Sequence, residues 1–247
     1  MLIPAERILM TGGSGRLGSE LAPLLPGIIT PGWPDELDVT DPCSVDAVLA
    51  RWQPEVVVHA AAYTDVAGAE YERARCWKVN VDGTRNVMQA VAARGIFLVF
   101  LSTDYVFDGV YGSFREDDPV GPVRNYYSLT KLVGEAIVRC TPAYLIIRTS
   151  FRPREWPHPV AFTDVYTSQD YLDCLAPDFA LAIQRCRDIP YPVVHIAGER
   201  TSSYELARRR KPDVQPGSKR QAVVALPDDC SLDSSRWRAL KKAWALG

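Results

Sequence analysis

The amino-acid sequence predicts an α/β protein built on a doubly wound parallel sheet. Apolar runs of strand length alternate with helical segments between residues 7 and 150, and a glycine-rich turn follows the first run. The central runs are continuously apolar, as expected of strands that helices cover on both faces. Strands and helices that alternate in this way form parallel strands joined by right-handed crossovers. After Ser150 the chain becomes rich in proline and less regular, which predicts a smaller C-terminal portion.

Each predicted element has its own sequence signal. Strands are expected at residues 7–11, 27–30, 55–62, 96–103, 143–150 and 191–198, where apolar residues are concentrated. Helices are expected at residues 15–27, 41–52, in a long stretch that ends near residue 94, and at residues 127–140, 168–186, 202–212 and 231–247. Asp41 before Pro42 is an N-cap signal, Gly95 is a stop signal, and Ser202 with Glu205 makes a capping box.

Composition and charge exclude several classes of protein. The 247 residues carry a formal net charge of -2, with 47% hydrophobic and 23% charged residues, which is typical of a globular protein. A near-neutral chain has no electrostatic preference for nucleic acid, and no apolar run is long enough to span a membrane. Six cysteines without a C-x-x-C pair and three histidines predict no metal site and reduced thiols, as in a cytoplasmic protein. No signal peptide is expected, because Glu6 and Arg7 interrupt a short apolar run.

The glycine turn predicts a dinucleotide site. Gly12, Gly15 and Gly18 lie between the first strand and the first helix. In such a motif the first glycine permits a tight turn, the second lets backbone N–H groups approach a pyrophosphate, and the third allows the helix to pack closely on the strand. A purely structural turn is the alternative, and this context disfavours it. Arg16 can hold a phosphate or lie in solvent, so NAD and NADP both stay open.

Tyr127 and Lys131 are the predicted catalytic pair. They lie four residues apart at the start of a helix, so they share one face. A nearby ammonium favours the phenolate and lets a tyrosine, whose ordinary pKa is about 10, exchange a proton near neutral pH. Ser102 and Thr103 lie at the carboxyl end of a predicted parallel strand, where ligands bind in such sheets. By itself such a pair is more often structural, but together with the glycine turn and these hydroxyls it predicts a proton donor.

Six segments resemble the dTDP-4-dehydrorhamnose reductase-like family of extended short-chain dehydrogenase/reductases. They are TGGSGRLG, VVHAAAYTDV, NVDGTRNV, STDYVFDG, YSLTKLVGE and IIRTS, in the family's order. The resemblance covers residues 8–150 well and the remainder loosely. It implies a Rossmann-type fold, an NADP or NAD cofactor with NADPH favoured, and reduction of a 4-keto group on a nucleotide-linked deoxysugar. Residues 1–150 are then the cofactor-binding core, and residues 151–247 are a reduced substrate-binding portion with elements that pack back on the core.

The resemblance also implies roles for individual residues. Tyr127 is the proton donor, Lys131 binds the nicotinamide ribose and lowers the pKa of the tyrosine, and Thr103 is the hydroxyl partner. The expected cofactor-binding residues are Gly12, Gly15, Arg16, Leu17, Gly18, Asp38, Val39, Ala60, Ala61, Ala62, Asn80, Ser102, Tyr127 and Lys131. The expected substrate-binding residues are Asp104, Tyr105, Arg152 and Trp156, the last two through charge and stacking on a diphosphate and a base. Plainer roles in packing or loop shape stay open for residues 60–62, 80, 104 and 105.

Two departures from the family pattern leave questions open. Residues 30–33 occupy the place of the usual acidic ribose ligand without supplying one, so the choice between NAD and NADP stays open. The part after Ser150 is shorter than in the family, which keeps other functions open. The first alternative is a non-catalytic NADP-binding subunit, like the regulatory subunit of methionine adenosyltransferase. The second is a nucleotide-sugar epimerase or dehydratase of the same superfamily. The sequence identifies neither the sugar nor the nucleotide, and it leaves the oligomeric state open, a homodimer included.

Overall fold

The structure is a computed structural model that describes residues 2–222 and 226–246. The chain divides into two compact units, neither of which is continuous in sequence. The first unit comprises Met1–Ser102, Arg124–Ile147 and Ala176–Val193, and the second comprises Thr103–Val123, Arg148–Leu175 and Val194–Gly247. These units do not coincide with the functional division expected at residue 150, which stays a prediction. Residues 103–123 group with the second unit, and residues 176–193 return to the first.

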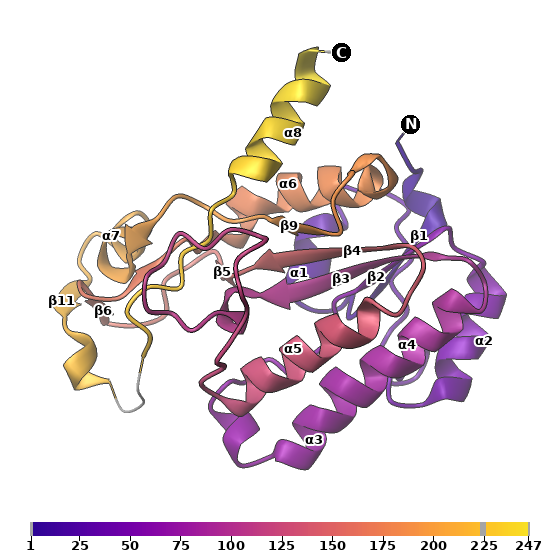
Figure 1. Cartoon of the computed structure of the whole chain (residues 1–247), viewed down its shortest axis with the longest axis horizontal. Coiled ribbons are helices and arrows are strands. Elements are labelled where there is room, and N and C mark those ends of the chain that lie inside the picture. The colour runs from indigo at the N-terminus through magenta and orange to yellow at the C-terminus, as the bar shows by residue number, and fades with distance from the viewer. Residues whose placement is uncertain (1, 223–225, 247) are drawn as a thin grey trace. The chain divides into compact units, whose positions relative to one another are not determined.

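A five-stranded sheet has the order β1-β2-β3-β4-β9. Its strands are β1 Ile8–Thr11, β2 Val56–His59, β3 Phe97–Thr103, β4 Tyr144–Thr149 and β9 Val193–His195. β1, β2 and β3 are parallel neighbours, with Leu9 opposite Val57 and Val57 opposite Leu98. Helices α4 (Gly83–Ala92) and α5 (Tyr126–Val138) lie on one face of the strands, and α6 (Leu172–Gln184) lies on the other (Figure 1). The predicted doubly wound α/β class is confirmed.

The strand expected at residues 27–30 is present only as an isolated bridge between Leu9 and Ile29. The amide of Met10 donates to Ile29 O, and the amide of Ile29 donates to Ile8 O, which places this segment on the edge of β1 away from β2. Prolines at positions 26 and 31 flank the bridge and supply no amide, so the pairing cannot extend. The segment that follows β1 in the chain thus lies along one edge of β1, and β2 pairs with the opposite edge. The switch point of the sheet, where ligands bind in such folds, is at the carboxyl end of β1.

The helices of the first unit begin near the expected positions. Helix α1 (Arg16–Leu21) ends earlier than expected, since Pro23 cannot donate a backbone hydrogen bond. Helix α2 (Pro42–Trp52) begins under its predicted cap, because the Asp41 side chain accepts from the amide of Cys43. The long helix expected to end near residue 94 is instead α3 (Arg73–Trp77), a π-helical turn (Lys78–Asp82) and α4. Such turns are frequent at functional sites, and this one contains Asn80.

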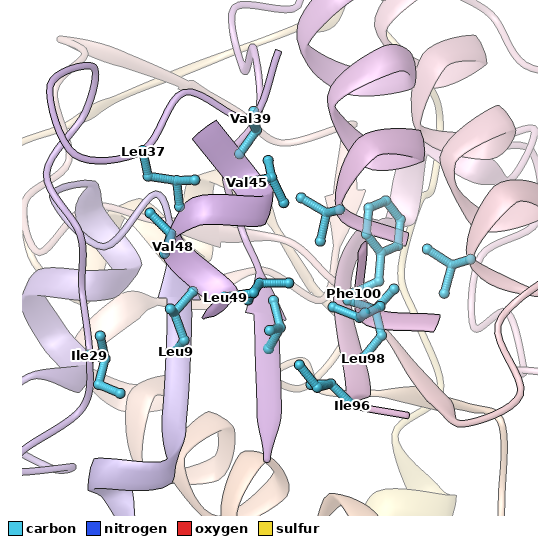
Figure 2. Close-up of a cluster of buried hydrophobic side chains, with 14 of the residues drawn as sticks. Leu9, Ile29, Leu37, Val39, Val45, Val48, Leu49, Ile96, Leu98 and Phe100 are labelled. Carbon is cyan, nitrogen blue, oxygen red and sulfur yellow. The ribbon is translucent and has the colours of Figure 1, made fainter. Parts of the chain in front are cut away.

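Apolar side chains from the sheet and the helices form the core of the first unit. Figure 2 shows part of it, with side chains from β1, β3 and α2 turned toward one another. Each buried aliphatic or phenyl side chain contributes about 1.5–3 kcal/mol. The buried members are Leu9, Ile29, Leu37, Val39, Val45, Val48, Leu49, Val57, Val87, Val91, Ile96, Leu98, Phe100, Val138, Ile146 and Val193. Phe100, near the carboxyl end of β3, belongs to this core and also contacts the predicted catalytic lysine, Lys131.

The second unit is built from short strand pairs. The pairs are β5 (Phe151–Arg152) with β8 (Asp170–Tyr171), β6 (Val160–Phe162) with β11 (Gln215–Gly217), and β7 (Tyr166–Thr167) with β10 (Thr201–Ser202). Helix α7 (Ser203–Arg208) has the predicted capping box between Ser202 and Glu205, and α8 spans Ser235–Leu246. A small hydrophobic cluster includes Trp156, Tyr171 and Leu206.

Short 3-10 helices in the chain span Ala5–Arg7, Gly68–Glu70, Asp104–Val106, Cys186–Asp188 and Lys219–Gln221.

Candidate active site

The glycine turn that joins β1 to α1 is closely packed on its inner side. Gly12 has a φ of +70°, and a Cβ on it would lie 2.8 Å from Ala61 N, so both conformation and space require glycine. A Cβ on Gly18 would lie 1.9 Å from Gly13 O, because α1 packs directly on the turn. Gly15 is exposed, and its amide donates to Gly12 O over 2.9 Å. A turn that is packed inside and open at Gly15 fits a pyrophosphate.

Four other predicted cofactor residues surround this turn and the loop before α2. Leu17 and Val39 are 6% and 5% exposed, so their side chains pack inside the protein. The carboxylate of Asp38 accepts from the amide of Thr40 over 2.8 Å, which shapes its own loop. Arg16 is exposed. Of these four, Arg16 has the side chain best placed to meet a phosphate from solvent.

Asn80 anchors the loop that follows β2. Its Oδ1 accepts from Tyr63 N over 2.8 Å, and its Nδ2 donates to Tyr63 O over 3.2 Å and to Thr130 Oγ1 over 2.9 Å. Asn80 is 2% exposed, so these bonds are shielded from water. The side chain therefore ties the loop with residues 60–62 to the α5 residue that precedes Lys131. These contacts make Asn80 a support for residues predicted to line the cofactor, and its own contact with the cofactor stays a prediction.

His59 connects β1, β2 and the π-helical turn through an ordered chain of hydrogen bonds. Thr84 Oγ1 donates to Asn80 O over 2.6 Å, so it accepts from His59 Nε2 over 3.1 Å. His59 Nδ1 then accepts from Thr11 Oγ1 over 2.8 Å, and Thr11 Oγ1 accepts from a loop amide. The arrangement requires a neutral imidazole, and burial lowers the pKa of His59 to about 3, with the charge of Lys131 adding to the effect. The sequence shows no partner for His59 because the two hydroxyls are 48 and 25 positions away.

Two side chains accept hydrogen bonds from backbone amides in the first turn of helix α5. The Asn125 side chain caps its first turn, and Glu70 Oε1 accepts from Tyr126 N over 2.7 Å. The guanidinium of Arg73 pairs with Glu70 at 2.9 Å and lies 5.1 Å from the centre of the Tyr126 ring. These contacts hold the turn that carries the half-buried Tyr127. The sequence does not identify Glu70, because it lies 56 residues before its partner.

Lys131 is 5% exposed and points from α5 to β3. Its Nζ donates to Leu101 O over 2.6 Å and lies 4.2 Å from the centre of the Phe100 ring. Burial lowers the pKa of Lys131 from 10.5 to about 8, while the charge of Glu135, and that of Cys76 once its thiol ionises at high pH, act to raise it. At pH 7 the amine is therefore mostly protonated. Lys131 thus places a cation one helical turn from the Tyr127 backbone, and the catalytic role of the pair stays a prediction.

Ser102 and Glu135 form a buried contact beside Lys131. Ser102 Oγ donates to Glu135 Oε1 over 2.6 Å, and the two residues are 5% and 2% exposed. The other carboxylate oxygen lies 3.6 Å from a guanidinium nitrogen of Arg139. Lys131 and Glu135, one turn apart on α5, thus bind consecutive residues of β3. Glu135 was not among the predicted site residues, although an acidic residue four positions after the lysine is a recognisable signal for an i, i+4 pair.

In the second unit, Thr103 belongs to a polar cluster with a buried acid. Its Oγ1 donates to Asp104 Oδ1 over 3.0 Å and accepts from Tyr105 N over 3.2 Å. Burial raises the pKa of Asp104 to about 7, although hydrogen bonds from Thr103 and Ser150 act to lower it. Asp104 Oδ2 is buried and has no hydrogen-bond partner among the described residues. Asp104 is therefore an acid that changes charge near neutral pH.

Arg152 and Trp156 stack on each other in the second unit. The guanidinium carbon of Arg152 lies 5.0 Å from the centre of the Trp156 ring, and its Nε donates to Gln169 Oε1 over 2.7 Å. Trp156 is only 7% exposed and belongs to the hydrophobic cluster of this unit. Stacking of a base on Trp156 does not fit this burial, because the tryptophan packs in the cluster and the guanidinium already lies over its ring. Burial also raises the pKa of Tyr105, which is therefore a neutral hydroxyl.

Two other chemical features were expected to be absent. Within residues 2–222 and 226–246, no three His, Cys, Asp or Glu side chains are grouped as metal ligands. No helix in that part of the chain is long and apolar enough to cross a membrane. The six cysteines are present as free thiols.

Comparison with known sequences points to one family. The model of the RmlD substrate binding domain matches residues 6–152. A dTDP-4-dehydrorhamnose reductase of Streptomyces griseus is 44% identical over 154 residues, which are 60% of this chain and 50% of that protein. A dTDP-4-keto-6-deoxy-D-glucose reductase of Streptomyces niveus is 39% identical over 136 residues, which are 54% of this chain and 47% of that protein. The chain thus spans about half the length of the curated relatives it matches.

Solved structures match over a larger part of the chain. A hypothetical dTDP-4-dehydrorhamnose reductase from Sulfolobus tokodaii has a TM-score of 0.81 and 33% identity, covering 95% of this chain and 94% of that chain. A dTDP-4-dehydrorhamnose reductase from Bacillus anthracis, in complex with NADP, has a TM-score of 0.81 and 27% identity, covering 94% and 91%. A Thermus thermophilus UDP-glucose 4-epimerase, at 19% identity and a TM-score of 0.70, shares the fold alone. The predicted Rossmann-type fold and the family resemblance are confirmed.

Proposed function

Because the chain belongs to the RmlD substrate binding domain family, we propose that it is an NAD(P)H-dependent reductase of a 4-keto group on a nucleotide-linked deoxysugar. The observation that carries the proposal is Lys131. It is a buried amine, held on Leu101 O, whose pKa of about 8 keeps it charged one helical turn from Tyr127. Burying a cation costs free energy, and groups kept at such a cost are concentrated at functional sites. Stabilising a phenolate is a role that would account for a buried ammonium here.

The cofactor has a set of residues that fits it. The turn from Gly12 to Gly18, the loop of residues 60–62, Ser102 and Lys131 would hold it, and the exposed backbone at Gly15 leaves room for a pyrophosphate. When bound, the reduced nicotinamide supplies the hydride that reduces the ketone carbon. NADPH is the form we propose, since the Bacillus anthracis relative is in complex with NADP and Arg16 is exposed beside Gly15.

Tyr127 supplies the proton in this reaction. As the ketone carbon gains hydride, the C=O π bond breaks toward oxygen, and the Tyr127 hydroxyl transfers its proton to that oxygen. The product is an alcohol, and the phenolate recovers a proton from solvent. The Lys131 ammonium stabilises the phenolate by charge, which is why it must stay protonated. Thr103 as a hydroxyl partner, and Asp104, Tyr105 and Arg152 as substrate contacts, remain part of the proposal.

The names of the similar enzymes support a dTDP-linked 4-keto sugar as the substrate class. Their matched regions cover about half of each protein, so the sugar itself is left to experiment. A cytoplasmic location and a homodimer belong to the same proposal.

A panel of 4-keto nucleotide sugars with NADPH and NADH tests the proposed activity, read at the nicotinamide absorbance. We expect Tyr127→Phe to reduce turnover at least about 100-fold while the cofactor dissociation constant changes less than about 3-fold, because one hydroxyl is lost. Tyr126→Phe is the matched control on the same helix, and it should retain turnover. Near-full activity of Tyr127→Phe would contradict the proton-donor role.

The same panel separates the alternatives. A protein that binds NADPH but turns over no keto sugar would be a non-catalytic cofactor-binding subunit. An epimerase or dehydratase would convert the sugar without net consumption of reduced cofactor, which product analysis would detect while the absorbance stays constant.

A further inference from the structure

We propose that Glu135 is a positioning residue for the Tyr127–Lys131 pair. Its buried carboxylate holds the carboxyl end of β3 through Ser102 and keeps Lys131 positively charged. The catalytic consequence rests on the proposed function, but the electrostatic part concerns the protein without cofactor or substrate and can be tested there.

The first part of the argument is geometric. Lys131 Nζ donates to Leu101 O over 2.6 Å, and Ser102 Oγ donates to Glu135 Oε1 over 2.6 Å. The two α5 side chains therefore bind two consecutive residues of β3 through short, buried hydrogen bonds. Two such bonds one helical turn apart set both the rotation and the position of α5 along the strand. Tyr127, on the turn before Lys131, is placed by the same contacts.

The second part concerns charge. The groups that face Lys131 are Glu135 from α5, Cys76 from α3, His59 from β2 and the Phe100 ring from β3, with the Tyr127 phenol one turn earlier on its own helix. His59 is neutral, since its pKa is about 3, and burial raises the pKa of the Cys76 thiol, which keeps it protonated at pH 7. Among these groups of the described chain, the carboxylate is the one that supplies negative charge.

Two contacts of Glu135 favour its ionised form, whereas its burial opposes it. It accepts a hydrogen bond from Ser102, and the guanidinium of Arg139 lies 3.6 Å from its second oxygen. Both a donor and a nearby cation stabilise a carboxylate. Burial drives the proton off Lys131, and the charge of Glu135 opposes that loss. Without it, only about half of the lysine would be protonated at pH 7, and its stabilisation of a phenolate would weaken accordingly.

Glu135→Gln separates this electrostatic role from a merely structural one. Glutamine retains an oxygen that accepts from Ser102 but carries no charge. The measurement is the titration of the Lys131 side chain in cofactor-free protein, by NMR of ¹³Cε-labelled lysine, with Lys131→Met used to assign the signal among six lysines. We expect the Lys131 midpoint to move from about 8 toward about 7 in Glu135→Gln, a shift on the order of one pH unit. Asp46→Asn, which removes an exposed carboxylate on α2, should leave the midpoint unchanged.

If reductase activity is present, the pH profile provides the second measurement. Turnover requires protonated Lys131, so it falls as the pH rises through the lysine midpoint. We expect this alkaline limb of kcat/KM to move down by the same one unit or so in Glu135→Gln, with Glu135→Asp, which keeps the charge, restoring most of it. A structural role alone would lower the rate at every pH without moving the limb.

The outcomes are distinct for the two proposals. A Lys131 midpoint in Glu135→Gln within about 0.3 unit of the unsubstituted protein overturns the charge role, whether or not the protein is a reductase. Should Glu135→Gln not fold, Glu135→Met carries the test, because an apolar side chain of similar length also removes the charge and should lower the Lys131 midpoint, and an unchanged or higher midpoint overturns the role. A Lys131 midpoint that falls by the expected one unit or so in Glu135→Gln, with no turnover of any keto sugar by the unsubstituted protein, supports the positioning role and rejects the proposed activity.

Discussion

Replacement of Lys131 by methionine is expected to stabilise the protein while it abolishes turnover. A fall in the pKa of the folded lysine from 10.5 to about 8 means that keeping the amine charged costs about 3 kcal/mol at neutral pH. Methionine has a similar length and no charge, so the variant avoids this cost. It also loses the buried hydrogen bond from Lys131 Nζ to Leu101 O, which costs about 2 kcal/mol. The net gain is about 1 kcal/mol at pH 7, or about 2–4 °C in Tm.

The pH dependence of this difference has a definite sign. Between about pH 8 and 10.5 the unfolded lysine holds a proton that the folded lysine has released, so the folded state of the unsubstituted protein gains stability as the pH rises. Below pH 8 both states are protonated and the full cost is present. We therefore expect Lys131→Met to be more stable than the unsubstituted protein at pH 7 and less stable at pH 10. The change in the difference between pH 7 and 10 is about 2.5 kcal/mol, since by pH 10 the folded lysine has lost most of its charge while the unfolded lysine has not.

Urea unfolding at pH 7, 8, 9 and 10 measures this difference for the two proteins side by side. Lys242→Met, at an exposed position on α8, is the matched control and should stay within about 0.5 kcal/mol of the unsubstituted protein at each pH. A difference between Lys131→Met and the unsubstituted protein that does not change from pH 7 to 10 would refute the reasoning. It would mean that the buried amine has an ordinary pKa.

Two further predictions concern the glycine turn and the buried acid of the second unit. Gly18→Ala places a Cβ 1.9 Å from Gly13 O, so we expect at least about 3 kcal/mol of destabilisation and loss of NADPH binding, measured by thermal unfolding and cofactor titration; a variant with unchanged Tm would contradict the packing described. Asp104, with a pKa raised from 3.8 to about 7, favours folding most below pH 3.8 and loses that contribution as the pH rises through 7. Asp104→Asn should therefore stabilise the protein more at pH 8 than at pH 5 in paired urea titrations, and an equal effect at both values would show that Asp104 is ionised throughout.

Much of the candidate active site could be predicted from the sequence because the signals used are local. The three glycines of the turn occupy fixed spacings between a strand and a helix, and Tyr127 and Lys131 share a helical face because they are four residues apart. Burial of the sheet followed from continuous apolar runs in β2 and β3. The two secondary-structure elements that the sequence predicted wrongly, the second strand and the long helix, were interrupted by local features. Prolines at positions 26 and 31 limited the predicted second strand to one bridge, and a π-helical turn at Lys78–Asp82 divided the long helix.

The sequence by itself determined the succession of strands and helices and the family, and it proposed the residues that bear the chemistry, since all of these depend on composition and spacing along the chain. Only the tertiary structure decided what surrounds those residues. His59 with Thr11 and Thr84, Glu70 at the start of α5, and Ser102 with Glu135 are pairs separated by 25 to 56 residues. The low pKa of Lys131 and the burial of Trp156 likewise arise from packing. Desolvation and hydrogen bonding act through space, so they become known only when distant segments have been brought together.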